Sequence, residues 1–175
     1  MPVYDFTLKF KLPDLESPEI YIDKLYESGC DDALVGIGKK GYIALNFTRD
    51  SVSAYRAISS AIGNIKEAIP EATLVNVSPD LVGITDIANL LQCSRQNIRK
   101  LILKDNPRCP SPVYEGAQSI WHLAEILTWL IEDRAYSIEE TLIETAKTTM
   151  TLNLAQRCQT ITSKIPEDFN TPIAF

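Results

Sequence analysis

The segment from Ile84 to Leu103 constrains the fold more than any other part of the sequence. Thr85 is a suitable helix N-cap residue, and a second one, Ser94, follows Cys93 nine residues later. Apolar residues at helical spacing form the expected inner face of the first helix: Ile87, Ala88 and Leu91. The pattern predicts two short helices joined by a tight turn.

The second helix of this pair has a clear division between its two faces. Ile98, Leu101 and Ile102 are spaced i, i+3 and i+4, so they are expected to point inward. The polar residues around them are then left on the outer face: Arg95, Gln96, Asn97, Arg99 and Lys100. Arginine pairs with guanine, asparagine and glutamine pair with adenine, and lysine neutralises phosphate. The sequence therefore predicts a recognition helix that enters the major groove of DNA.

The residues that follow complete a known pattern. The stretches "TDIANLLQCSRQNIRKL", "PRCPSPVYEG" and "IWHLAEILTWL" occur in that order. Together they resemble the winged helix-turn-helix of MerR-type and AlpA/excisionase-type regulators of bacteria and phages, over roughly residues 81–131. The resemblance implies a β-wing closed by Trp121 and a later helix that forms a dimer. The wing departs from the family pattern, because Arg108 precedes it, Glu115 lies within it, and no other basic residue is present, so wing contact with phosphate is not expected.

The charge of the chain is unevenly distributed. The 175 residues carry a formal net charge of −6, which by itself disfavours nucleic acid. Residues 85–115 nevertheless hold five basic and three acidic residues, so positive charge concentrates where the motif is. The eight candidate DNA contacts are Ser94, Arg95, Gln96, Asn97, Arg99, Lys100, Lys104 and Arg108. The alternative is that these cations only solvate the outer face of a helix.

Composition narrows the remaining classes of function. No apolar run approaches the length of a membrane span and the N-terminus lacks the features of a signal peptide, so we expect a cytoplasmic protein. Four scattered cysteines and one histidine, His122, do not suggest a metal site, a cofactor or a nucleophile–base pair. We expect reduced cysteines and no enzymatic activity. His122 is interpreted as a capping or packing residue, and Trp129 as a core residue.

Residues 1–79 predict a separate α+β domain. Strands are expected at about 4–12, 33–37, 42–47 and 72–78, and helices after Ser17-Pro18 and after Ser51. The predicted inner faces are Ile20, Ile22, Leu25 and Tyr26 in the first helix, and Val52, Tyr55, Ile58, Ile62 and Ile65 in the second. This β-α-β-β-α-β order is that of a ferredoxin-like domain. Asp31 and Asp32 are interpreted as solvated loop carboxylates, and "GKKG" as a hairpin turn.

The rest of the chain divides into two parts. Residues 80–133 are the expected winged helix-turn-helix, and residues 134–175 follow it. In this last part Ser137 and Glu140 fit a capping box for a helix that extends to about Thr160 and could serve oligomerisation. The leading hypothesis is a sequence-specific regulator that binds double-stranded DNA as a homodimer. The alternative is an accessory or antitoxin-like subunit that binds a protein partner, and an enzyme carried by the N-terminal domain is a more remote third.

Overall fold

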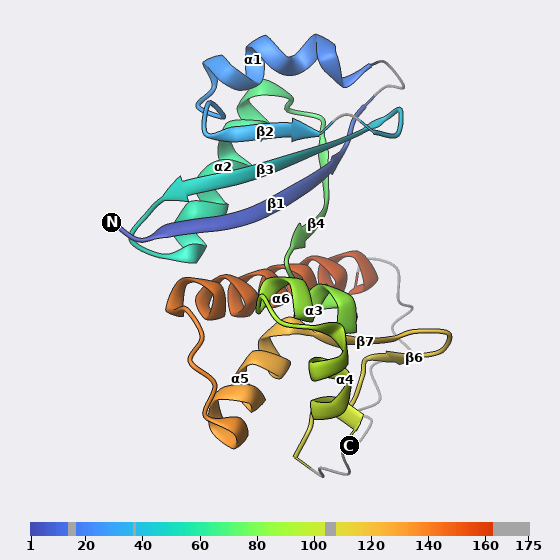
Figure 1. Cartoon of the computed structure of the whole chain (residues 1–175). Coiled ribbons are helices and arrows are strands. Elements are labelled where there is room, and N and C mark those ends of the chain that lie inside the picture. The colour runs from blue at the N-terminus through green and yellow to red at the C-terminus, as the bar shows by residue number, and fades with distance from the viewer. Residues whose placement is uncertain (14–16, 37, 104–107, 163–175) are drawn as a thin grey trace.

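The computed structural model describes residues 1–13, 17–36, 38–103 and 108–162. Its strands form a four-stranded sheet in the order β2-β3-β1-β4 and a three-stranded sheet in the order β5-β7-β6, and all neighbouring strands are antiparallel. Each sheet belongs to a separate hydrophobic core. The chain is therefore an α+β protein built from two packed units (Figure 1).

The first unit contains the four-stranded sheet and two helices. Its elements are β1 (Val3–Lys11), the 3-10 helix η1 (Pro18–Tyr21), α1 (Ile22–Glu27), β2 (Ala33–Gly36), β3 (Tyr42–Asp50), α2 (Ala54–Ala68) and β4 (Thr73–Ser78). In β1 the even-numbered residues from Tyr4 to Phe10 are buried, whereas Val3, Asp5 and Lys9 are exposed. Buried residues of both helices join this inner side of the sheet in one core. Both helices thus cover the same face, and the predicted element order is the observed one.

The predicted inner faces of both helices are partly wrong. α2 begins at Ala54, and its N-cap is Ser53, not Ser51, because Ser53 has extended backbone and its hydroxyl accepts the Arg56 N–H at 3.2 Å. The buried face of α2 is rich in small residues that allow close approach to the sheet: Ala54, Ala57, Ile58, Ala61 and Ile65. Val52 and Tyr55 are exposed instead.

The first helical segment differs in a similar way. Its first turn, η1, is a 3-10 helix, and the side chain of Ser17 makes no capping hydrogen bond. The tighter 3-10 turn changes the phase of the residues that follow. Pro18, Tyr21 and Leu25 are buried. Of the predicted inner face only Leu25 is therefore confirmed, and Ile20, Ile22 and Tyr26 are exposed.

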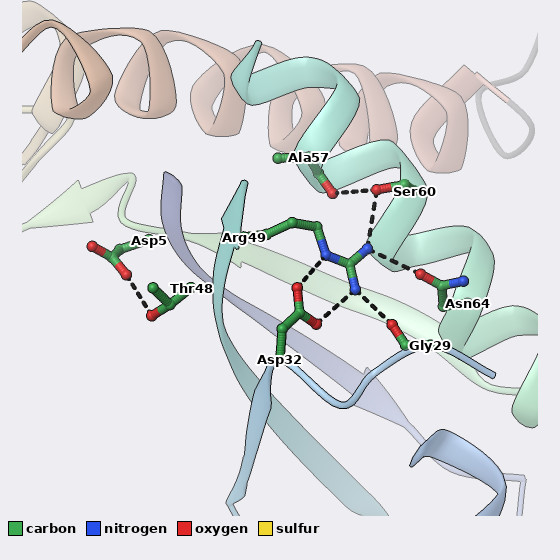
Figure 2. Close-up of polar contacts among 8 residues, drawn as sticks. All are labelled: Asp5, Gly29, Asp32, Thr48, Arg49, Ala57, Ser60 and Asn64. Carbon is green, nitrogen blue, oxygen red and sulfur yellow. Dashed lines mark hydrogen bonds and ion pairs between the residues drawn. The ribbon is translucent and has the colours of Figure 1, made fainter. Parts of the chain in front are cut away.

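An arginine on the inner side of β3 ties the sheet to α2 (Figure 2). Arg49 forms a two-point ion pair with Asp32, from Nε at 2.6 Å and from Nη2 at 2.8 Å. Its other N–H groups donate to Gly29 O, Ser60 Oγ and Asn64 Oδ1, at 2.8–3.0 Å. All five guanidinium donors are thereby used. Asp32 is thus a structural ion-pair partner, which corrects its interpretation as a solvated loop carboxylate.

The second unit contains the short sheet and four helices. Its elements are β5 (Leu81–Val82), α3 (Ile84–Leu90), α4 (Arg95–Leu103), β6 (Tyr114–Glu115), β7 (Ser119–His122), α5 (Leu123–Arg134) and α6 (Glu140–Thr162). Trp121 and Trp129 are both buried in its core, at 4% and 5% exposure. The core position predicted for Trp129 is confirmed. Across the described residues, none of the helices combines the length and the apolar character that crossing a membrane requires.

The long helix α6 packs against both units. It begins at Glu140, not directly after Ser137, since residues 135–139 are not helical. Ala146 is buried in the second core and Leu152 packs against the first. Glu144 accepts hydrogen bonds from Tyr4 Oη at 2.6 Å and from Ala54 N at 2.9 Å. The hydrogen bond to Glu144 raises the pKa of Tyr4 to about 12.

A buried polar cluster lies where the two units meet. Asp80 is 5% exposed, and its carboxylate lies 2.6 Å from His122 Nδ1 and accepts a hydrogen bond from Asn153 Nδ2 at 2.7 Å. The Val77 N–H donates to Asn153 Oδ1, and Asn153 Nδ2 donates to the Val77 carbonyl, each at 2.8 Å. The Asp80 carbonyl accepts the Leu123 N–H at 2.7 Å, at the start of α5. β4, β7, α5 and α6 are therefore joined through one set of directional contacts.

Replacing Asn153 with Ala should destabilise the protein by about 1–3 kcal/mol, because the Val77 backbone and the buried Asp80 carboxylate would lose hydrogen-bond partners. Urea unfolding measures the change. Gln159→Ala, an exposed position on the same helix, is the matched control and should be close to neutral. Equal stability of the two variants would show that the polar cluster contributes nothing.

Candidate nucleic-acid interface

Helices α3 and α4 are joined by a tight turn in which Gln92 has a positive φ of 50°. The Cys93 N–H donates to the Ala88 carbonyl at 2.9 Å and closes the turn. α4 begins as predicted, because the hydroxyl of Ser94 accepts the Asn97 N–H at 3.2 Å. The N-cap predicted for α3 is wrong. The N-cap residue of α3 is Gly83, and its N–H donates to the Asp86 carboxylate at 2.8 Å. Thr85 lies inside the helix and is exposed.

The outer face of α4 is polar, cationic and exposed. Ile98 is buried, and Leu101 and Ile102 pack against the same core, so the predicted inner face is confirmed. The candidate contact residues on α4 are all exposed: Arg95, Gln96, Asn97, Arg99 and Lys100. No acidic residue occurs in the sequence of α4. One face of this helix thus anchors it, and the other presents three cations and two amides to solvent.

Some candidate contacts have neighbours within the chain. Asn97 Nδ2 donates to Tyr136 Oη at 3.4 Å, a long contact on the exposed side of the helix. Arg108 Nη1 lies 3.2 Å from Asp133 Oδ1 of α5, although the Arg108 side chain remains 80% exposed. A phosphate at Arg108 would therefore share the guanidinium with Asp133. Lys104 lies outside the described residues.

The predicted wing is a short antiparallel hairpin. β6 pairs with β7, and β7 pairs on its other side with β5. The Val113 N–H donates to the Ile120 carbonyl at 2.8 Å at the base of the hairpin. Tyr114 is 63% exposed, and Glu115 is exposed beside it. The hairpin therefore presents an aromatic ring and a carboxylate, and no cation.

Trp121 connects the hairpin to the core. Its side chain is buried in the cluster that also holds Ile98 and Leu127, and its Nε1 donates to the Pro110 carbonyl at 3.1 Å. The indole thus contributes apolar area and satisfies its one donor. The packing position predicted for Trp121 is confirmed.

An acidic groove lies along α5. It has a volume of about 730 Å³ and runs between residues 108–111 and α5. Glu125, Glu132 and Asp133 line it from α5, and Arg108 lines it from the opposite side. Three carboxylates against one arginine make this groove unfavourable for a phosphate.

Metal ligands and reactive thiols are the other kinds of site considered among the described residues. Among the described residues, no group of three or more histidine, cysteine or acidic side chains could hold a metal ion. Burial raises the pKa of the Cys30 thiol to about 11, and burial also raises the pKa of Cys109. These two thiols are thus held in their protonated, weakly nucleophilic form.

The sequence interpretation missed the residues that position the site. Asp80 and Asn153 were not singled out, and His122 was interpreted only as a capping or packing residue. Its ring contacts the Asp80 carboxylate, and its backbone occupies the N-cap position of α5. These residues lie 42 and 73 positions from their partners, so no local pattern signals the cluster.

Comparisons with protein-family models, with curated proteins and with solved structures gave no match to this chain. Support for a function therefore comes from the geometry and chemistry of the chain itself.

Trp121→Ala should cost about 3–5 kcal/mol, because it leaves a large cavity between the hairpin and the helices and removes the partner of the Pro110 carbonyl. Thermal melting measures the loss. Tyr114→Ala on the same hairpin removes an exposed ring and serves as the control. A Trp121→Ala melting temperature equal to that of the unmodified protein would contradict the packing role.

Proposed function

We propose that this chain is a sequence-specific regulator that binds double-stranded DNA through α4. The proposal treats residues 81–131 as a winged helix-turn-helix like those of MerR-type and AlpA/excisionase-type proteins, and the first unit as a ferredoxin-like domain. The main support for DNA binding is the outer face of α4. It exposes three cations and two amides, while the other face of the helix packs into the core. The strand order β2-β3-β1-β4 with antiparallel neighbours supports the ferredoxin-like assignment.

The chemistry of α4 suits the reading of base edges. Arg95 and Arg99 are one helical turn apart, and each arginine can pair with both acceptors of a guanine. Gln96 and Asn97 can pair with adenine in the same groove. A helix that only solvated its outer face would have no need of amides beside the arginines. The combination favours base reading over simple solvation.

The absence of cations from the β6–β7 hairpin limits the affinity of one copy. In this chain the wing brings no cation to the backbone of DNA, and phosphate contacts supply much of the affinity of such proteins. A homodimer would double the contacts and read two half-sites about one helical turn apart. The second half of α6 offers a surface for this contact, with Leu154 and Ile161 exposed at 44% and 52% and Cys158 exposed between them.

A second candidate function is a protein-interaction subunit, such as an accessory or antitoxin-like partner of an enzyme. The acidic groove along α5 favours it, because three carboxylates and a volume of about 730 Å³ suit a basic segment of another protein. Both activities can coexist, since the groove and α4 are different surfaces.

Arg95→Ala and Arg99→Ala should each weaken binding to a selected duplex by about 1–3 kcal/mol and relax the preference at one base pair. Selection from random duplex DNA with the full-length protein would supply the site, and fluorescence anisotropy would measure affinity. Lys100→Ala should weaken binding to all sequences alike and reduce the salt dependence. Arg56→Ala, an exposed arginine on α2, is the control. Affinity unaffected by both α4 arginine substitutions would exclude α4 as the reading helix.

Leu154→Glu should convert the proposed homodimer to a monomer of 19.5 kDa, because it places a charge in the apolar stripe of α6. Light scattering coupled to size exclusion gives the mass. Gln159→Glu adds the same charge on another side of the helix and should leave the dimer intact. If the unmodified protein is itself a monomer at micromolar concentration, with and without DNA, the dimer proposal fails.

A further inference from the structure

The first unit has one face of its sheet without a covering helix. α1 and α2 both pack on the inner side, so the side chains opposite them form an outer face. The register of β1 against β3 gives the rows of this face: Asp5 opposite Thr48, Thr7 opposite Asn46, Lys9 opposite Ala44, and Lys11 opposite Tyr42. Asn76 of β4 extends the Lys9 row, and Thr73 extends the Lys11 row.

Cations gather around an aromatic ring at one end of this face. Lys9 Nζ lies 5.4 Å from the centre of the Tyr42 ring, and Lys39 Nζ lies 5.3 Å from it. Lys11, opposite Tyr42 in register, and Lys40, in the turn before β3, are also exposed. The four lysines and Tyr42 are called the lysine cluster below. The ring draws two ammonium groups together from different elements, which holds them in place before any ligand arrives.

The charge on the outer face is polarised. Asp5 and Asp50 lie at the opposite end, and the rows between carry neutral hydrogen-bonding side chains such as Thr7, Asn46 and Asn76. The second unit approaches the acidic end and the neighbouring neutral row, where a cavity of about 370 Å³ is lined by Asp5, Thr7 and Asn46 and by residues of the 139–145 stretch. Neither Tyr42 nor any of the four lysines lines this cavity. The lysine cluster is thus left open, in a chain whose net charge is −6.

We propose that the lysine cluster and the neutral rows beside it bind a single strand of nucleic acid, independently of α4. The lysines pair with phosphates, Tyr42 stacks on a base in place of one ammonium group, and the amides of Asn46 and Asn76 meet base edges. A single strand fits better than a duplex, because the outer face of a sheet has no projecting element to enter a groove, and a duplex would leave the tyrosine and the amides unused. Charge complementarity favours an anionic polymer over a neutral ligand.

The test measures fluorescence anisotropy of the full-length protein with oligothymidine and oligouridine of about twelve nucleotides, and with a duplex of the same length. The double variant Lys9→Glu/Lys39→Glu should weaken single-strand binding by roughly tenfold or more and reduce its salt dependence. Tyr42→Leu should also weaken it through lost stacking. The control Lys24→Glu/Arg56→Glu makes the same charge change on exposed residues of the helical side and should bind normally. Thermal melts confirm that all variants are folded.

Further variants distinguish single-strand binding by the lysine cluster from the duplex binding proposed for α4. Arg95→Ala/Arg99→Ala should leave single-strand binding unchanged, whatever its effect on duplex DNA. Equal weakening by the control variant, or a duplex bound as tightly and weakened as much by Lys9→Glu/Lys39→Glu, would overturn the proposal. An unmodified protein that binds no oligonucleotide would also overturn it and would leave an acidic protein segment as the occupant of the lysine cluster.

Discussion

The arrangement of this molecule depends on the contact between the Asn153 amide, the Asp80 carboxylate and the backbone of Val77. These groups lie where the two units meet, Asp80 is buried and Asn153 half-buried, and a buried polar group without partners is costly, so the orientation of the units that satisfies all of them is favoured. The hydrophobic effect is not directional, so apolar contacts alone would fix the relative orientation of the two units less strictly. The same Asp80 also holds His122 at the end of β7 and, through its carbonyl, the first turn of α5. The hairpin and the helices that support α4 are therefore positioned from this point.

The features that sequence analysis predicted correctly are those that a short stretch of chain decides. Alternating burial in β1 and the inward position of Ile98 in α4 follow from periodicity, and Ser94 caps α4 because its hydroxyl needs only the backbone three residues ahead. The inner face of α2 was predicted less well. Val52 and Tyr55 are apolar and suitably spaced, but alanines at 54, 57 and 61 allow the helix to approach the sheet along a different face.

Long-range polar contacts could not be predicted in this way. Asp32 resembled a solvated loop residue because its partner, Arg49, lies 17 residues later on β3, and only the folded sheet brings the two within 2.6 Å. The His122 interpretation was incomplete for the same reason. A charged residue in sequence gives no sign of whether its partner is water, another side chain or a ligand. Burial decides the question, and burial is a property of the whole fold.

Arg49 differs in its surroundings from the cations of α4 and of the lysine cluster. Arg49 is mostly buried and all its donors are used, so it stabilises the first unit and has nothing left for a ligand. The cations of α4 and of the lysine cluster are exposed, and keeping them exposed beside one another costs free energy through mutual repulsion. An anionic ligand removes that cost. Each proposed binding surface lies within a single unit, so binding there would not require one unit to be ordered against the other. The Asn153–Asp80 contact therefore contributes to how the two units are held together, whereas binding at either proposed surface would depend on the exposed cations themselves.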